Sequence, residues 1–111
     1  MVSTRAPRAE VAVAGRWQGN INDPDMGTRR FEVRFAVADK GVTGSMKTWR
    51  GSIELSSPLR DISFSRGTVR FTADLQGTAY KFEGALEENT INGAAAREGR
   101  SPAPFTLQYA E

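Results

Sequence analysis

The chain has 111 residues, of which 39% are hydrophobic and 25% are charged, as is typical of a single globular domain. It contains no cysteine and no histidine, which excludes disulfides, thiolate metal sites, cysteine nucleophiles and Ser–His–Asp triads. The net charge of +2 is too small to imply a nucleic-acid partner by itself.

The first residues, 1–12, are expected to form a flexible segment ahead of a single β-barrel domain over 13–111. Early arginines and the small residues at 12–14 are faintly similar to an export signal, but the apolar stretch is short and Glu10 interrupts it. We therefore predict no signal peptide in this chain, which is compatible with a cytoplasmic location or with secretion after trimming. No run approaches the roughly 18 apolar residues of a transmembrane helix, so we expect no membrane span.

Apolar and polar residues alternate with a period of two along most of the remaining chain. In 29–38, for example, Phe31, Val33 and Phe35 alternate with charged residues, as a half-buried strand requires. This pattern predicts strands near 14–22, 29–38, 41–49, 51–57, 60–66, 68–75, 78–87, 90–97 and 103–110. Turn signals separate them at 23–27, 39–41, 57–58, 66–67, 76–77, 88–89 and 99–100.

Eight or nine short strands joined by short turns predict an all-β fold. Because sequential hairpins favour a meander and closure removes strand edges, we expect an antiparallel up-and-down β-barrel of about eight strands. Small residues are expected on its inner face, where tight curvature needs close strand approach, at Gly19, Gly44, Gly84, Gly93 and Ala95.

Trp17 stands out in the first predicted strand, where it shares a face with Gly19 and Ile21. A tryptophan on an apolar strand face usually serves packing, so we favour a plug at one end of the barrel. A stacking platform for a ligand is the alternative.

The strand start G-x-W resembles the signature of lipocalins and related barrels, in which the tryptophan closes one end beside an arginine near the last strand. Arg97 and Arg100 are the candidates for that arginine here. About residues 15–109 resemble a small bacterial lipocalin-like β-barrel domain found alone or ahead of α/β-hydrolase or serine-peptidase domains. The matching stretches are GRWQGNI (15–21), VTGSM (42–46), YKFEGAL (80–86), TING (90–93) and PFTL (104–107). The resemblance implies a lipocalin-like fold without catalytic chemistry, in a stand-alone barrel or an excised accessory domain of a hydrolase.

The leading functional hypothesis is a non-catalytic binding or accessory module that holds a small apolar ligand. Eight strands leave an interior that side chains just fill or that admits one small ligand, and the number of aromatic residues favours a mostly filled interior. The candidate ligand contacts are Trp17, Tyr80, Phe82 and Tyr109, with a narrow apolar pocket near Tyr80 and Tyr109. No cofactor is predicted.

The alternative is a protein–protein interaction domain that binds a partner, a second copy of the chain or a fused hydrolase. Its surface would lie around Trp49 and Arg50, because alternation places Trp49 opposite Met46, either facing outward or at a bend. A basic outer patch is also expected from Arg29, Arg30, Arg34, Arg66, Arg70 and Lys81. A nucleic-acid-binding surface would need several aromatic residues among these basic ones, and Trp49 is the one candidate, so we predict no nucleic-acid partner.

Catalytic and metal sites are not expected. Glu32, Glu54 and Glu83 alternate with apolar residues and should face solvent, where nothing raises the pKa of a carboxylate for acid–base catalysis. The acidic turn over 22–25 lacks the ligand spacing of a calcium loop, so a plain hairpin is the better interpretation. We therefore predict that the chain is not an enzyme and has no metal site.

Overall fold

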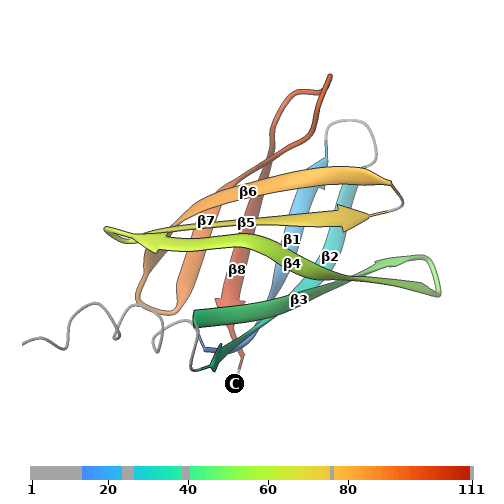
Figure 1. Ribbon diagram of the computed structural model, residues 1–111. Coiled ribbons are helices and arrows are strands. Elements are labelled where there is room, and N and C mark those ends of the chain that lie inside the picture. The colour runs from blue at the N-terminus through green and yellow to red at the C-terminus, as the bar shows by residue number, and fades with distance from the viewer. Residues whose placement is uncertain (1–13, 24–26, 39–40, 76, 111) are drawn as a thin grey trace, which may run out of the picture.

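The computed structural model describes residues 14–23, 27–38, 41–75 and 77–110, apart from the side chains of Ala38 and Arg50; the expected N-terminal segment lies outside these residues. The chain forms a closed antiparallel barrel in which each strand pairs with its sequence neighbours and the last pairs with the first (Figure 1). The strands are β1 (Gly15–Asp23), β2 (Gly27–Ala38), β3 (Gly41–Arg50), β4 (Ile53–Ser65), β5 (Thr68–Leu75), β6 (Thr78–Glu87), β7 (Thr90–Ala96) and β8 (Ala103–Tyr109). The predicted all-β, up-and-down barrel is confirmed.

The two strands predicted at 51–57 and 60–66 are one 13-residue strand, β4. The turn predicted at Ser57 and Pro58 is wrong, since both residues pair with β3. Pro58 is exposed on the outer face, where its ring meets solvent.

A β-bulge explains why the alternation breaks inside β4. The pairing of β4 with β5 shifts between Arg60 and Ser63, and Asp61 adopts a φ of 55°. The extra residue moves the inward-facing positions from the odd-numbered Leu59 to the even-numbered Ile62. A bulge also bends its strand. In Figure 1, β4, β5 and β6 cross in front of β8, β1 and β2.

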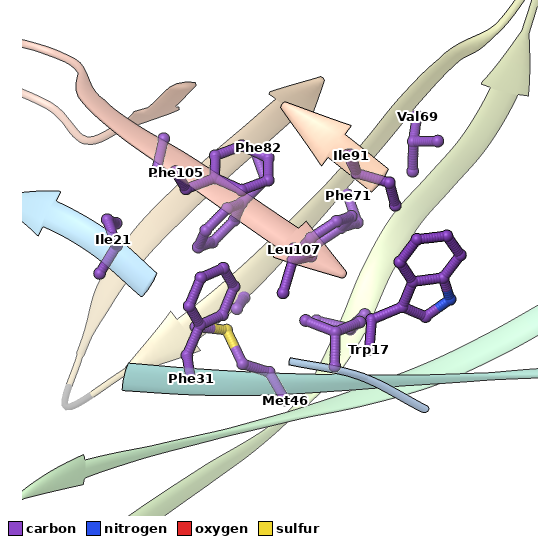
Figure 2. Packing of buried hydrophobic residues seen from close by; sticks show 14 of the residues in the cluster. Trp17, Ile21, Phe31, Met46, Val69, Phe71, Phe82, Ile91, Phe105 and Leu107 are labelled. Atoms are coloured by element: carbon purple, nitrogen blue, oxygen red, sulfur yellow. The ribbon is translucent and has the colours of Figure 1, made fainter. Parts of the chain in front are cut away.

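All six phenylalanines of the chain join one network of ring contacts inside the barrel. At its centre the ring of Phe82 stacks on Phe71 with centroids 4.8 Å apart, and Phe105 meets Phe82 edge-on at 5.3 Å. Figure 2 shows these rings converging from different strands. The contacts continue to the remaining rings, Phe31, Phe35 and Phe64. The barrel interior is therefore a packed core.

Trp17 lies at the barrel end where β1 begins and β8 ends. Its side chain is 1% exposed, and its ring meets Tyr109 edge-on with centroids 5.3 Å apart. This burial is what the plug interpretation requires.

Glycine allows the barrel to close at two places on its inner face. A Cβ atom at Gly19 would overlap the carbonyl oxygen of Thr106 in β8, and one at Gly93 would overlap the carbonyl oxygen of Glu83 in β6. The predicted close approach of strands at inward-facing small residues is confirmed at both positions.

Replacing Trp17 by alanine should lower the free energy of unfolding by roughly 3–5 kcal/mol, because a large cavity replaces the ring. Urea unfolding measures this change. Val37→Ala at the same barrel end is the control and should have little effect, since Val37 is 46% exposed. An unchanged urea midpoint for Trp17→Ala would rule out the plug.

Replacing Gly19 by alanine should destabilise the β1–β8 closure by about 1–3 kcal/mol or more, because backbone must move to admit the methyl group. Hydrogen exchange should speed up most in β1 and β8, and denaturant unfolding gives the total change. Asn20→Ala, at the adjacent exposed position, is the matched control. Equal stability of the two variants would contradict the steric role of Gly19.

Candidate functional site

Trp49 lies on the outer face of β3, one residue before the strand ends, so of the two predicted positions, outward or at a bend, it occupies the outward one. Its indole is half-buried, and the guanidinium carbon of Arg30 lies 4.2 Å from the ring centroid. A groove of about 180 Å³ runs beside it. The groove is lined by Arg16, Gln18, Arg30, Phe31, Glu32 and Trp49. Arg30 thus lies beside Trp49. Arg50, which was predicted with Trp49 for this surface, has a side chain outside the described residues.

The far wall of this groove is built from paired side chains of β1 and β2. Arg16 Nη1 donates to Glu32 Oε2 at 3.1 Å and to Gln18 Oε1 at 3.4 Å. The Arg16 and Glu32 side chains are only 23% and 19% exposed, so their charges neutralise each other in a partly desolvated position.

A second groove of about 630 Å³ lies over the outer face of β4 to β7. Thr72 faces outward between inward-facing Phe71 and Ala73, yet it is only 5% exposed, so it forms part of the groove floor. The charged residues around the groove are of both signs and comprise Asp61, Arg70, Lys81 and Glu83. Arg70 and Glu83 already pair at 3.3 Å.

A polar cluster that sequence analysis missed lies at the barrel end opposite Trp17. Arg97 donates from Nη1 to the Tyr80 hydroxyl oxygen at 3.1 Å and from Nη2 to Asp23 Oδ2 at 3.4 Å. The Asp23 side chain is 7% exposed and belongs to β1 rather than to the predicted turn. No local pattern links Asp23 to Arg97, because 74 positions separate them. The cluster ties β1, β6 and the end of β7 together.

This arrangement corrects two predictions. Arg97 and the neighbouring Arg100 follow the end of β7, at the opposite end from Trp17, so neither occupies the position of a lipocalin arginine. Tyr80 lies near the start of β6 and Tyr109 at the end of β8, so they too are at opposite ends and cannot share one pocket.

The four predicted ligand contacts are not brought together. Trp17 and Phe82 are 1% and 2% exposed within the core. Tyr109 is 42% exposed against Trp17, and Tyr80 is half-buried beside Arg97.

The predicted single basic patch is wrong. Arg29 lies on the same face of β2 as Phe31, toward the interior, whereas Arg30 and Arg34 face outward. Arg70 and Lys81 are on β5 and β6, which β3 and β4 separate from β2 around the barrel.

The outward orientation predicted for Glu32, Glu54 and Glu83 is confirmed, and each forms an ion pair on the outer face. The described part of the chain contains no group of three or more His, Cys, Asp or Glu side chains that could hold a metal ion. Within the same residues, no helix has the length and apolar character needed to cross a membrane.

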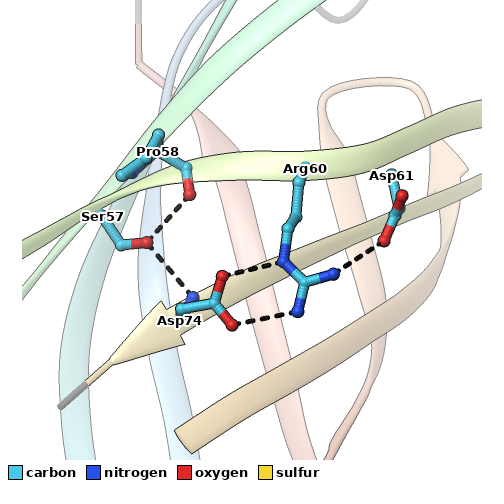
Figure 3. Close-up of polar contacts among 5 residues, drawn as sticks. All are labelled: Ser57, Pro58, Arg60, Asp61 and Asp74. Atoms are coloured by element: carbon cyan, nitrogen blue, oxygen red, sulfur yellow. Dashed lines mark hydrogen bonds and ion pairs between the residues drawn. The ribbon is translucent and has the colours of Figure 1, made fainter. Parts of the chain in front are cut away.

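The bulge in β4 is held by an exposed ion-pair cluster (Figure 3). Arg60 donates to both carboxylate oxygens of Asp74, at 2.8 and 3.0 Å, and to Asp61 Oδ2 at 3.1 Å. The hydrogen bonds from Arg60, with its positive charge, lower the pKa of Asp74 below the ordinary value of 3.8. A bidentate pair has more geometric specificity than most surface ion pairs.

The Arg60–Asp74 pair should make stability depend on pH. Because the folded-state pKa of Asp74 is lowered, its contribution is present above the unfolded pKa and is lost as pH falls through the folded pKa. Asp74→Asn should therefore be less stable than wild type at about pH 7, and the difference should shrink at about pH 2.5. Urea midpoints at both pH values measure it, with Glu87→Gln as the control. A difference that is constant with pH would contradict this coupling.

Comparison with known proteins supports the fold alone. No protein family and no curated protein matches the sequence. Among solved structures, a redesigned β-barrel is similar, with a TM-score of 0.78 and 14% sequence identity, over 94% of this chain and 96% of that chain. At this identity the similarity establishes that the chain is an eight-stranded antiparallel β-barrel.

Proposed function

We propose that this barrel is a non-catalytic binding or accessory module that contacts a protein partner through its outer face at Trp49. The contact area, called the Trp49 surface here, consists of Arg16, Gln18, Arg30, Glu32 and Trp49. The observation that carries the proposal is a half-buried indole on the outside of a sheet, beside a groove, with an arginine stacked on it. Tryptophan and arginine are enriched among residues that dominate binding energy at protein interfaces.

The packed interior supports an outer rather than an inner binding site. A small apolar ligand inside the barrel would have to displace phenylalanine rings such as Phe31 and Phe82, which are 0% and 2% exposed. Such displacement would open cavities and break ring contacts in the only large core of the described domain.

The proposal fits the resemblance to lipocalin-like bacterial barrels that accompany hydrolase or peptidase domains. In this interpretation the barrel supplies binding and the partner supplies chemistry, consistent with the absence of histidine and cysteine from the sequence. The partner is a separate protein or such a hydrolase domain.

The test is to select peptides from a random display library on immobilised wild-type barrel and to measure their affinity for Trp49→Ala. Loss of a central aromatic contact should weaken binding about tenfold or more. Val37→Ala, an exposed apolar position at the other barrel end, is the control and should bind normally. Thermal unfolding of Trp49→Ala establishes that the variant is folded.

Peptides that bind Trp49→Ala as tightly as wild type would overturn the proposal. Native mass spectrometry of gently purified protein separates the alternatives. Extra mass that disappears on denaturation would indicate a ligand held in the barrel, whereas a bare dimer would indicate self-association.

A further inference from the structure

β2 carries more arginines than acidic residues, and one of the arginines without an acidic partner among the described residues, Arg30, lies at the Trp49 surface. The strand carries three arginines and one glutamate, and the glutamate, Glu32, is paired with Arg16 from β1. Within the described residues, neither Arg30 nor Arg34 forms an ion pair on the outer face of β2. Elsewhere the outward carboxylates of Glu54, Asp74 and Glu83 each have a basic partner.

Arg30 is held in place although its charge is not neutralised. Its backbone carbonyl accepts a hydrogen bond from the Thr48 hydroxyl at 2.9 Å, and Thr48 is 2% exposed. Its guanidinium lies over the Trp49 ring with the carbon 4.2 Å from the centroid. Stacking leaves the edge of a guanidinium accessible, and that edge matches the two oxygens of a carboxylate.

The uncharged neighbours of Arg30 leave room for an external anion. Asn20, its pairing partner on β1, is neutral, and so is Trp49 on the β3 side. The nearest carboxylate in the groove, Glu32, is already bonded to Arg16 at 3.1 Å. The groove therefore offers one cation stacked on a half-buried indole.

We infer that the Trp49 surface recognises an acidic peptide segment, with Arg30 as the residue that selects a carboxylate. An aspartate or glutamate of the partner binds the guanidinium edge of Arg30, and an apolar side chain next to it packs on the Trp49 indole. This inference rests on the proposed function and specifies the chemistry of its partner.

A nucleic acid fits this surface less well than a peptide. Glu32 belongs to the Trp49 surface and Glu54 pairs in register with Trp49, so carboxylates lie here beside Arg30. A phosphate backbone needs several cationic contacts along its length, whereas a peptide can place one carboxylate at Arg30.

The probes are the hexapeptide Glu-Glu-Phe-Glu-Glu-Leu and its amide counterpart Gln-Gln-Phe-Gln-Gln-Leu. Each is titrated into the ¹⁵N-labelled 111-residue chain while the Trp49 indole N–H and the Arg30 Nε–H signals are followed. The acidic peptide should shift both signals saturably, with affinity about tenfold higher than the amide peptide, since a charged hydrogen-bonded pair is lost in the latter.

Arg30→Gln should abolish the preference for the acidic peptide. Arg30→Lys should retain part of it, because the charge remains while the planar fork is lost. Lys81→Gln is the matched control, since it removes one positive charge from the outer face of β6 and should leave the preference unchanged.

Equal affinity for the two peptides, no shift at Trp49 with either, or tighter binding of a single-stranded oligonucleotide at the same signals would overturn the inference. The display selection tests the proposed function independently of this inference. If the display selection yields neutral peptides that depend on Trp49, the Trp49 surface is a binding site and only its acidic selectivity is wrong.

Discussion

The stacked pair of Phe82 and Phe71 is the contact on which the rest of this barrel depends. From it, ring contacts extend to the other four phenylalanines and join strands that are far apart in the sequence. Aromatic rings fill a narrow interior because they bury large areas with few rotatable bonds. Once packed, these rings fill the barrel interior, which is why the proposed binding site lies on the outer face.

Closing a short chain around these rings requires backbones to approach closely and one strand to bend. Gly19 and Gly93 allow the approach, since a methyl group at either position would overlap a neighbouring carbonyl. The bulge at Asp61 provides the bend, and the Arg60–Asp74 pair fixes it from outside. Strand curvature thus depends on glycines, which have no side chain, on the inner face and on the Arg60–Asp74 ion pair on the outer face.

The outer face is organised by charge. Most outward carboxylates are paired across strands, which stabilises the sheet weakly and leaves little attraction for a partner. Arg30 differs because it stacks on Trp49 and keeps its charge unpaired within the described residues. In the proposed recognition surface, Trp49 provides the apolar half and its cross-strand neighbour Arg30 the electrostatic half.

The sequence by itself determined the fold class, the strand alternation, the inward glycines and the burial of Trp17, because these follow from periodicity and residue size. For Trp49 it left two positions open, on the outer face or at a bend. Only the tertiary structure showed that the strands predicted at 51–57 and 60–66 are one strand, β4, and that Tyr80 and Tyr109 lie at opposite barrel ends. It alone also showed the contacts of Arg97 with Asp23 and of Arg30 with Trp49. Each of these depends on pairing register, and register is set jointly by strands distant in sequence, a bulge and ring packing, which no local pattern encodes.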